Sequence, residues 1–304
     1  MHLLNKPLGD LQFYRAYNRA CRLEKLLSVS YYDISRYIGG YPQGERVEAL
    51  EMDQSTIFEI SNKADYQSVT PESTALFTAA MAGSEHGVKQ AIKAGGKVNY
   101  YHRPEDKTSA LHVACENGSV AVVQVLIEND ALIDIVAVTN KDTPLVLAAG
   151  AGHNKIVTIL ISKGANVNHQ NAYGNSALHQ ASKHHHLAVC QSLINAGANV
   201  DLKNNKGSTP LMLACLNEET SNSNKDMMKL FKLLIDSGAN VNEVDNNGAS
   251  AFHAAASSNN VKLLECLLES GANAMAKDSD GRTPLKMAEF HNHELPASIT
   301  AKLT

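Results

Sequence analysis

The chain has 304 residues, with 27 lysines and arginines against 31 aspartates and glutamates, and its formal net charge is −4. This mixed balance gives no reason to expect nucleic acid or an anionic membrane surface as the main partner. The five cysteines are odd in number and widely spaced, and no apolar run reaches the roughly 18 residues that a membrane helix needs, so we expect a soluble, cytoplasmic protein without a disulfide framework.

Residues 1–70 hold seven of the ten tyrosines and do not match the rest of the chain. Asp10 is placed to cap a helix whose residues Leu11, Tyr14, Tyr17 and Cys21 recur at three- and four-residue steps. We therefore predict a small, mostly helical N-terminal segment. It would act as a cap for the units that follow, or as a second docking site, and no family is identified in it.

The alternative for residues 1–70 is a catalytic unit, with the remainder of the chain selecting its substrate. Neither a phosphate-binding G-x-x-x-x-G-K-[ST] loop nor a G-x-S-x-G nucleophile motif occurs, and His2 and Cys21 are the only histidine and cysteine of the segment. A pocket of His, Cys and Asp near Cys21 would indicate the enzyme, and a packed helical cap would contradict it. We expect no enzyme, and no catalytic, cofactor-binding or metal-binding residues.

From residue 71 onward the sequence repeats itself. Six copies share an apolar anchor at Leu111, Leu145, Leu178, Leu211, Phe252 and Leu285, and a weaker copy with Leu76 precedes them. In each copy "(T/S)(P/A)L" or a close variant predicts a helix start, and a second helix at helical apolar spacing follows in most of them. In four copies "GAN" ends the second helix, at Gly164, Gly197, Gly238 and Gly271, and an Asn/Asp-Gly turn commonly begins the next copy. One copy cannot bury its apolar face alone, so the copies must stack into a solenoid.

This pattern resembles the ankyrin-repeat family, whose period is 33 residues and whose hallmark is T-P-L-H-x-A. The resemblance covers about residues 71–304 and implies an all-α solenoid of helix-turn-helix units with hairpin fingers. The predicted units are residues 71–103, 104–137, 138–170, 171–203, 204–244 with an insertion at 217–225, 245–277, and 278–304 as terminal cap. The insertion is either part of a binding surface or a tolerated surface loop.

The stretch "HQASKHHHLAVC" has the composition of a zinc-binding tract. The resemblance places His179 at the hallmark histidine, which hydrogen-bonds backbone, and His186 at the start of the second helix. Cys190 falls on the packed side of that helix. His185 replaces a glycine, which implies modest backbone strain, and His184 should project onto the concave face. Because this register scatters the possible ligands, we predict no metal site.

The resemblance further implies an adaptor or scaffold that binds a protein on the concave surface made by turn tips and first helices. Carried over residue by residue, the partner-binding residues are Tyr100, Tyr101, Asn140, Asp142, Tyr173, Asn175, Lys183, His184, Lys206, Asn247, Asp280, Arg282 and Phe290. An exposed aromatic such as Tyr173 is the kind of residue that becomes a binding hot spot. Tyr100 and Tyr101 are either a second anchor or a hydrophobic seal between the first two units.

A narrower hypothesis is a bacterial effector that acts on host proteins in the host cytosol. It follows from the association of an unrecognised N-terminal segment with "GANVN" repeats. We expect no bound nucleic acid, no membrane insertion and no cofactor, and a monomer is favoured. Asn168 and Asn242 occupy positions similar to asparagines that are hydroxylated in some ankyrin proteins, although most such asparagines only hold a turn.

Overall fold

The computed structural model describes residues 70–101, 108–216 and 224–301. The chain divides into two compact units, Met1–Thr70 and Pro71–Thr304, and every described helix belongs to the second. The helical cap predicted for residues 1–70, and the catalytic alternative for the same segment, lie outside the described residues.

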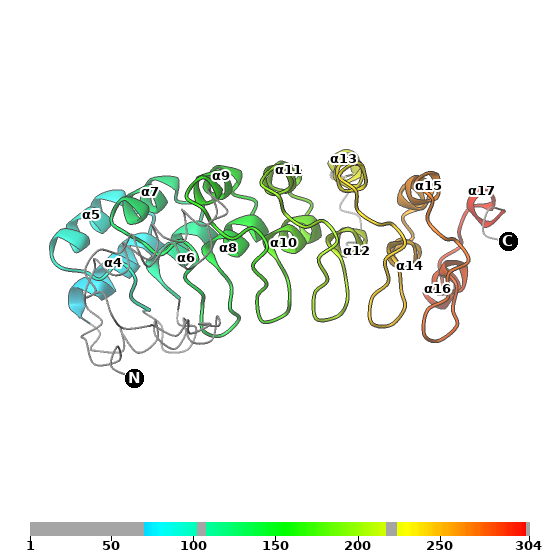
Figure 1. Cartoon of the computed structure of the whole chain (residues 1–304), viewed down its shortest axis with the longest axis horizontal. Helices are drawn as coiled ribbons and strands as arrows, with labels where there is room; N and C mark the ends of the chain where they lie inside the picture. Colours follow the sequence, from blue (N-terminus) through cyan, green and yellow to red (C-terminus); the bar gives the residue numbers. More distant parts are fainter. Residues whose placement is uncertain (1–69, 102–107, 217–223, 302–304) are drawn as a thin grey trace, which may run out of the picture. The chain divides into compact units, whose positions relative to one another are not determined.

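The second unit is a stack of helix pairs, in which first and second helices form two separate rows (Figure 1). The first helices are α4 (Pro71–Met81), α6 (Ala110–Glu116), α8 (Pro144–Gly150), α10 (Ala177–Lys183), α12 (Pro210–Cys215), α14 (Ala251–Ser257) and α16 (Pro284–Phe290). The second helices are α5 (Glu85–Lys93), α7 (Val120–Glu128), α9 (Asn154–Ser162), α11 (Leu187–Asn195), α13 (Asn224–Asp236), α15 (Val261–Glu269) and α17 (Ala297–Thr300). The prediction of an all-α solenoid is confirmed for the described residues.

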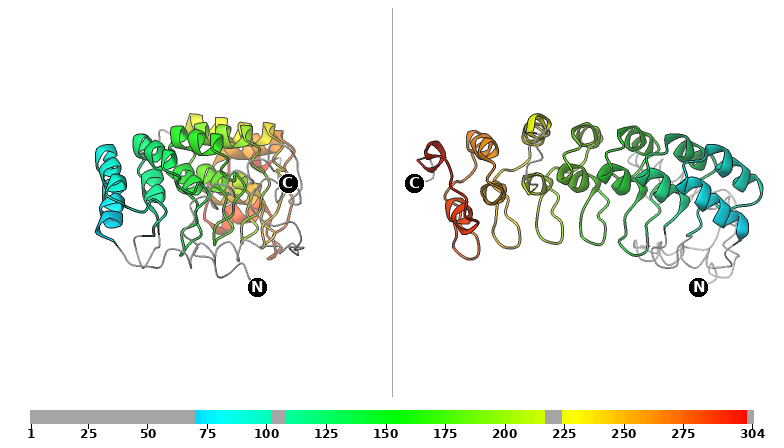
Figure 2. Two further views of the ribbon diagram at one scale, coloured as in Figure 1. Left: turned by 60° about the vertical axis from the view of Figure 1, so that its left-hand side comes forward. Right: turned by 180° about the vertical axis from the view of Figure 1, so that it is seen from behind.

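The fully described turns that join one pair to the next extend from the row of first helices, on the side away from the second helices (Figure 2). Two of these turns are closed by single antiparallel β-bridges, Tyr101 with Ser109 and Val244 with Ser250. Among the described helices none is long and apolar enough to cross a membrane, the longest being the 13 residues of α13.

The first helices begin at the hydroxyl residues that the sequence pattern predicts. Thr143, Thr209 and Thr283 each precede a proline at the start of a helix, and each hydroxyl accepts a hydrogen bond from the amide three residues later. Since proline lacks an amide hydrogen and has a helical φ, it opens a helix at no cost in hydrogen bonding. The second helices that close with "GAN" end at a glycine of positive φ, also as predicted, at Gly164, Gly197, Gly238 and Gly271.

The apolar anchors are buried where neighbouring pairs pack on each other. Leu111, Leu145, Leu178, Leu211 and Phe252 of the first helices are at most 1% exposed, and Leu285 of α16 is partly buried. The second helices contribute an equivalent series of leucines, which are fully buried, at Leu126, Leu160, Leu193, Leu234 and Leu267. Burying one such side chain stabilises the fold by roughly 1.5–3 kcal/mol, and this gain recurs at each junction between pairs.

One boundary differs in detail from the prediction. The insertion was expected to end at residue 225, but α13 begins at Asn224, so Asn224 and Lys225 are helical. The apolar spacing of Met227, Leu230 and Phe231 continues toward the helix start and can carry an additional turn. Residues 217–223 lie outside the described segments. At the other end the last pair closes with the short helix α17, which begins directly after Pro296.

Three hallmark histidines are buried and join successive pairs. His112, His179 and His253 each accept a hydrogen bond at Nδ1 from the backbone amide of the serine before the helix. At Nε2 each donates to a carbonyl of the next turn, at distances of 3.0 to 3.1 Å. This geometry requires the neutral ring with its proton on Nε2. Desolvation by burial lowers the pKa of His112 and of His179 to about 4, even though the backbone contacts oppose the shift.

This lowered pKa predicts a loss of stability in mild acid. The unfolded chain binds a proton at each histidine below about pH 6.5, whereas the folded chain does so only near pH 4. The contribution of each buried histidine to the free energy of unfolding is therefore fully present above pH 6.5 and is lost as the pH drops toward 4. At pH 5 the loss is about 2 kcal/mol per buried histidine. We therefore expect the free energy of unfolding of His179→Asn, measured in urea, to fall less from pH 7.5 to pH 5.0 than that of the unaltered chain.

His86, which is exposed on α5, provides the matched control. His86→Asn should keep the pH dependence of the unaltered chain. A His179→Asn variant that loses as much stability as the unaltered chain would show that this ring does not cause the dependence.

Candidate protein-binding surface

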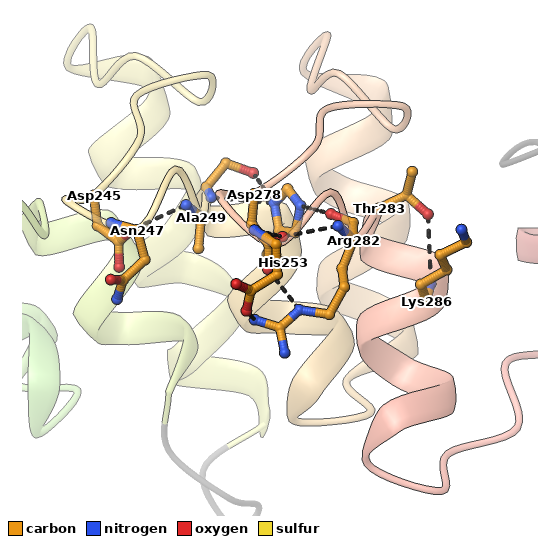
Figure 3. A network of polar contacts seen from close by, with 10 residues as sticks. Asp245, Asn247, Ala249, His253, Asp278, Arg282, Thr283 and Lys286 are labelled. Atoms are coloured by element: carbon orange, nitrogen blue, oxygen red, sulfur yellow. Dashed lines mark hydrogen bonds and ion pairs between the residues drawn. The ribbon is translucent and has the colours of Figure 1, made fainter.

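The connecting turns share one hydrogen-bond pattern. In four of them the first side chain uses an oxygen to accept the amides two and four residues later; these residues are Asn171, Asn204, Asp245 and Asp278. In the Asp245 turn the bonds come from Asn247 and Ala249, at 2.8 and 2.9 Å (Figure 3). The side chain thus closes each turn and holds its tip in one conformation.

Successive turns are also joined through their backbones. Carbonyls at equivalent positions accept an amide of the next turn, at 2.8 to 3.1 Å, and these carbonyls belong to Asn140, Tyr173, Lys206 and Asn247. With the equivalent Asp280, these five residues form what we call the turn row. Because the backbone of the first four is engaged between turns, their side chains are what remains for contact with another molecule.

A second series lies ten residues further along each unit, at the end of the first helix. We call it the helix-end row; it consists of Gly150, Lys183, Leu216, Ser257 and Phe290. In the last unit Arg282 joins the two rows, because its guanidinium pairs with Asp280 of the turn row and its guanidinium carbon lies 5.4 Å from the centre of the Phe290 ring. Together the two rows are the two-row surface.

Large apolar side chains are exposed on this surface. Tyr173 is 65% exposed, Leu216 52% and Phe290 66%. Leu216 was not predicted as a binding residue, although it lies 33 residues after Lys183, which was. The sequence does contain a signal that could have identified Leu216: the preceding unit has a lysine at the same register position, whereas this unit has an apolar residue.

Most of the predicted contact residues are accessible. Those exposed are Tyr173, Lys183, His184, Lys206, Asn247, Asp280 and Phe290, and those partly buried are Tyr101, Asn140, Asn175 and Arg282. His184 ends α10, and its ring stacks on that of His186 at 6.0 Å between centres. Whether these residues contact a partner stays a prediction.

Tyr100 and Asp142 are corrections to the predicted set, because both are buried. Asp142 is 7% exposed, and its carboxylate accepts a hydrogen bond of 2.7 Å from the Asn171 amide group. Burial raises the pKa of Asp142, and the Asn171 contact opposes the shift. Tyr100 is 9% exposed, which favours the seal over the anchor, and the Tyr101 hydroxyl donates to the Val136 carbonyl at 3.1 Å. Residues 102–107, which follow these two tyrosines, lie outside the described residues.

Arg282 is held in place by two carboxylates and an aromatic ring. Its Nε contacts Asp278 at 2.8 Å (Figure 3), and a terminal nitrogen contacts Asp280 at 2.5 Å. Burial alone would raise the pKa of Asp278, but the backbone and side chain of Arg282 outweigh it and lower that pKa. The exposed carboxylate of Asp280 and the ring of Phe290 therefore flank a positioned cation at the end of the two-row surface.

The histidines of the stretch at residues 179–190 each serve a structural contact. His186 donates from Nε2 to the Gly150 carbonyl of the preceding unit at 3.0 Å. His185 donates from Nε2 to the Ala214 carbonyl of the following unit at 2.8 Å. His185 has φ = +56°, as expected for a residue that replaces a glycine. Cys190 is fully buried on α11, as predicted. In the segments that the structure describes, no three His, Cys, Asp or Glu side chains come together as a metal site would require.

Asn168 and Asn242 also hold neighbouring units together. Each donates from its amide group to a glycine carbonyl of the next unit, at 3.3 Å for Asn168 and 3.1 Å for Asn242. Each side-chain oxygen also accepts a backbone amide of that unit. These contacts agree with a turn-holding role for both residues.

Comparison with known proteins gives consistent matches. A family model described as "Ankyrin repeats (3 copies)" matches residues 49–138, 130–204 and 220–295, and one described as "Ankyrin repeats (many copies)" matches residues 178–231. The crystal structure of the human ASB11 ankyrin repeat domain is similar, with a TM-score of 0.64 and 28% identity, over 77% of this chain and 96% of that one.

Two curated relatives illustrate the range of matches. The B-cell lymphoma 3 protein homolog of Mus musculus is 36% identical over 119 residues, which are 39% of this chain and 27% of that protein. The Phosphocholine transferase AnkX of Legionella pneumophila is 28% identical over 150 residues, which are 48% of this chain and 15% of that protein. The match thus spans less than a third of the length of either relative.

The close approach of neighbouring turns predicts a selective effect of Gly174→Ala. Gly174 has φ = +74°, and an added Cβ would lie 2.5 Å from the Asn205 amide nitrogen. Gly197, at φ = +85°, is the matched control, since no atom lies within 4 Å of its added Cβ. The left-handed conformation alone costs alanine roughly 1–2 kcal/mol, and Gly174→Ala should cost at least about 1 kcal/mol more because backbone must move.

Urea unfolding measures the two losses, and hydrogen exchange at the Asn205 amide locates the effect. Equal destabilisation by Gly174→Ala and Gly197→Ala, with unchanged exchange at Asn205, would contradict the close packing of the turns.

Proposed function

Because the chain belongs to the ankyrin-repeat family, whose repeats are protein-interaction modules, we propose that it is an adaptor or scaffold that binds a partner protein on the two-row surface. The fold leaves the partner open, because one scaffold serves unrelated targets in such families. The proposal therefore rests on the side chains that this chain presents in the two rows.

The observation that carries the proposal is the exposure of three large apolar side chains, Tyr173, Leu216 and Phe290, within the two rows of one surface. Exposed apolar and aromatic side chains that gather on one face mark interaction sites, and aromatic residues are frequent hot spots. The backbone of Tyr173 is bonded to the next turn, and Leu216 and Phe290 lie at the ends of the helices α12 and α16. A partner would therefore meet anchors that lose little conformational freedom on binding.

Charged side chains between the anchors would set the orientation of the partner. Lys183 and Lys206 are exposed near Tyr173 and Leu216 in the register, and Asp280 with Arg282 accompanies Phe290. A partner with acidic groups opposite the two lysines and a basic group opposite Asp280 would match this arrangement. Such complementarity contributes mainly to specificity and association rate.

The effector hypothesis is a narrower form of this proposal. It is supported by the match to a protein of Legionella pneumophila, named a phosphocholine transferase. That match covers 15% of the relative, so we propose no transferase activity for this chain. A cytosolic location, in a host cell if the chain is an effector, is part of the same proposal.

The test is affinity capture from eukaryotic lysate followed by mass spectrometry, with the full chain and the double variant Tyr173→Ala/Phe290→Ala as baits. Loss of two hot spots should weaken binding of the partner at least tenfold, since one such residue contributes about 2 kcal/mol or more. Met275→Ala is the matched control, because Met275 is also exposed and apolar, at 56%, but lies outside both rows. The Met275→Ala bait should retain the partner that the unaltered chain captures.

Thermal unfolding should confirm that all three baits are folded equally well. A partner held as tightly by the double variant as by the unaltered chain would overturn the assignment of binding to the two-row surface.

A further inference from the structure

The row of second helices carries a groove between α11 and α13. It has a volume of about 530 Å³ and is lined by Leu187, Ala188, Gln191, Lys229, Lys232, Leu233 and Asp236. A smaller hollow of about 350 Å³ adjoins it, since Leu187 and Ala188 line both. We call the larger one the outer groove. None of its residues belongs to the turn row or the helix-end row, so it is separate from the proposed partner surface.

The floor of the outer groove is apolar because of two residues, one on each of the helices that flank it. At the preceding junction, between α9 and α11, the Ser192 hydroxyl donates to the Asn154 side chain at 2.8 Å and bridges the helices. The same two positions between α11 and α13 hold Leu233 and Leu187, which are both only partly buried. A polar bridge is thus replaced by two leucines that remain accessible.

One wall of the outer groove is basic. Lys229 and Lys232 are both exposed, and a spacing of three residues puts them on the same face of α13. The same two positions hold Ala121 and Gln124 in α7, Lys155 and Thr158 in α9, Ala188 and Gln191 in α11, and Lys262 and Glu265 in α15. Among these described second helices α13 alone carries two lysines there. Asp236 lines the groove toward the end of α13, so the positive charge is confined to one part of the wall.

We propose that the outer groove binds an acidic amphipathic helix of a partner protein. Its apolar side chains would cover Leu187 and Leu233 and the aliphatic stems of the two lysines, while its carboxylates would pair with Lys229 and Lys232. The nine residues of α11 correspond to about 13 Å, which suits two to three turns of a docked helix. Asp236 repels a carboxylate at its end, so the acidic side chains should lie toward the lysines.

The probe for this proposal is a fluorescent 16-residue helical peptide of alanine, with leucines at i and i+4 flanked by glutamates. Binding to the full chain is measured by fluorescence anisotropy at 50 mM and 500 mM NaCl. We expect saturable binding that weakens at high salt, because the paired charges are exposed and screened. The matched peptide with lysines in place of the glutamates should not bind.

Two double variants locate the site. Lys229→Glu/Lys232→Glu should weaken binding of the acidic peptide at least tenfold. Lys155→Glu/Lys262→Glu makes the same change in charge at the same register on α9 and α15, and should leave binding within twofold of the unaltered chain. The Tyr173→Ala/Phe290→Ala variant should also bind normally, because the outer groove does not include those residues.

Three results would overturn the proposal. One is the absence of saturable binding of the acidic peptide to the folded full chain, and another is equal loss of binding in the two lysine variants. The third is self-association of the full chain that Lys229→Glu/Lys232→Glu abolishes, detected by sedimentation velocity. That result would assign the outer groove to a second copy of this chain.

Discussion

Each helix pair keeps its apolar face out of water only by packing on the pair beside it. A single pair buries too little surface to be stable alone, so Leu178 requires the neighbouring first helices just as Leu193 requires the neighbouring second helices. First helices pack on first helices and second helices on second helices. This arrangement sets a strict register, because each residue must meet its counterpart in the next unit. The positions of turns, buried histidines and exposed side chains all follow from that register.

The same register separates structural residues from residues that are free to vary. His179 donates a hydrogen bond to the Ser208 carbonyl of the next unit, and Asn171 donates one to the Asp142 carboxylate of the preceding unit. Both side chains are buried, which leaves no room for another ligand. Tyr173, two residues after Asn171, uses only its backbone in the stack and directs a large side chain to solvent. Rigid support next to an exposed aromatic ring is what a preorganised binding surface needs, because little entropy is lost when a partner binds.

The two sides of the stack differ in what they present. On the turn side, Tyr173, Leu216 and Phe290 are separate anchors among charged residues. On the side of the second helices, Lys229 and Lys232 of α13 lie beside an apolar floor. Under the two proposals made for these surfaces, the chain would hold two proteins at once, as a scaffold does.

Much of this architecture could be predicted from the sequence, because its signals are local. A threonine before Pro144, a glycine after α9 and the spacing of the leucines act within a few residues, and they predicted the helix starts, the helix ends and the stack itself. The placement of the histidines also followed, since each belongs to a repeated register. Sequence alone therefore determined the solenoid and the approximate location of its exposed positions.

Tertiary structure decided which of those positions are accessible. Asp142 is a turn residue by sequence, but Asn171, 29 residues later, covers and hydrogen-bonds it. The exposure of Leu216 and the outer groove depend in the same way on helices from different units. Burial is a property of several segments together, so a pattern within one unit predicts which residue stands at a position but not what lies over it.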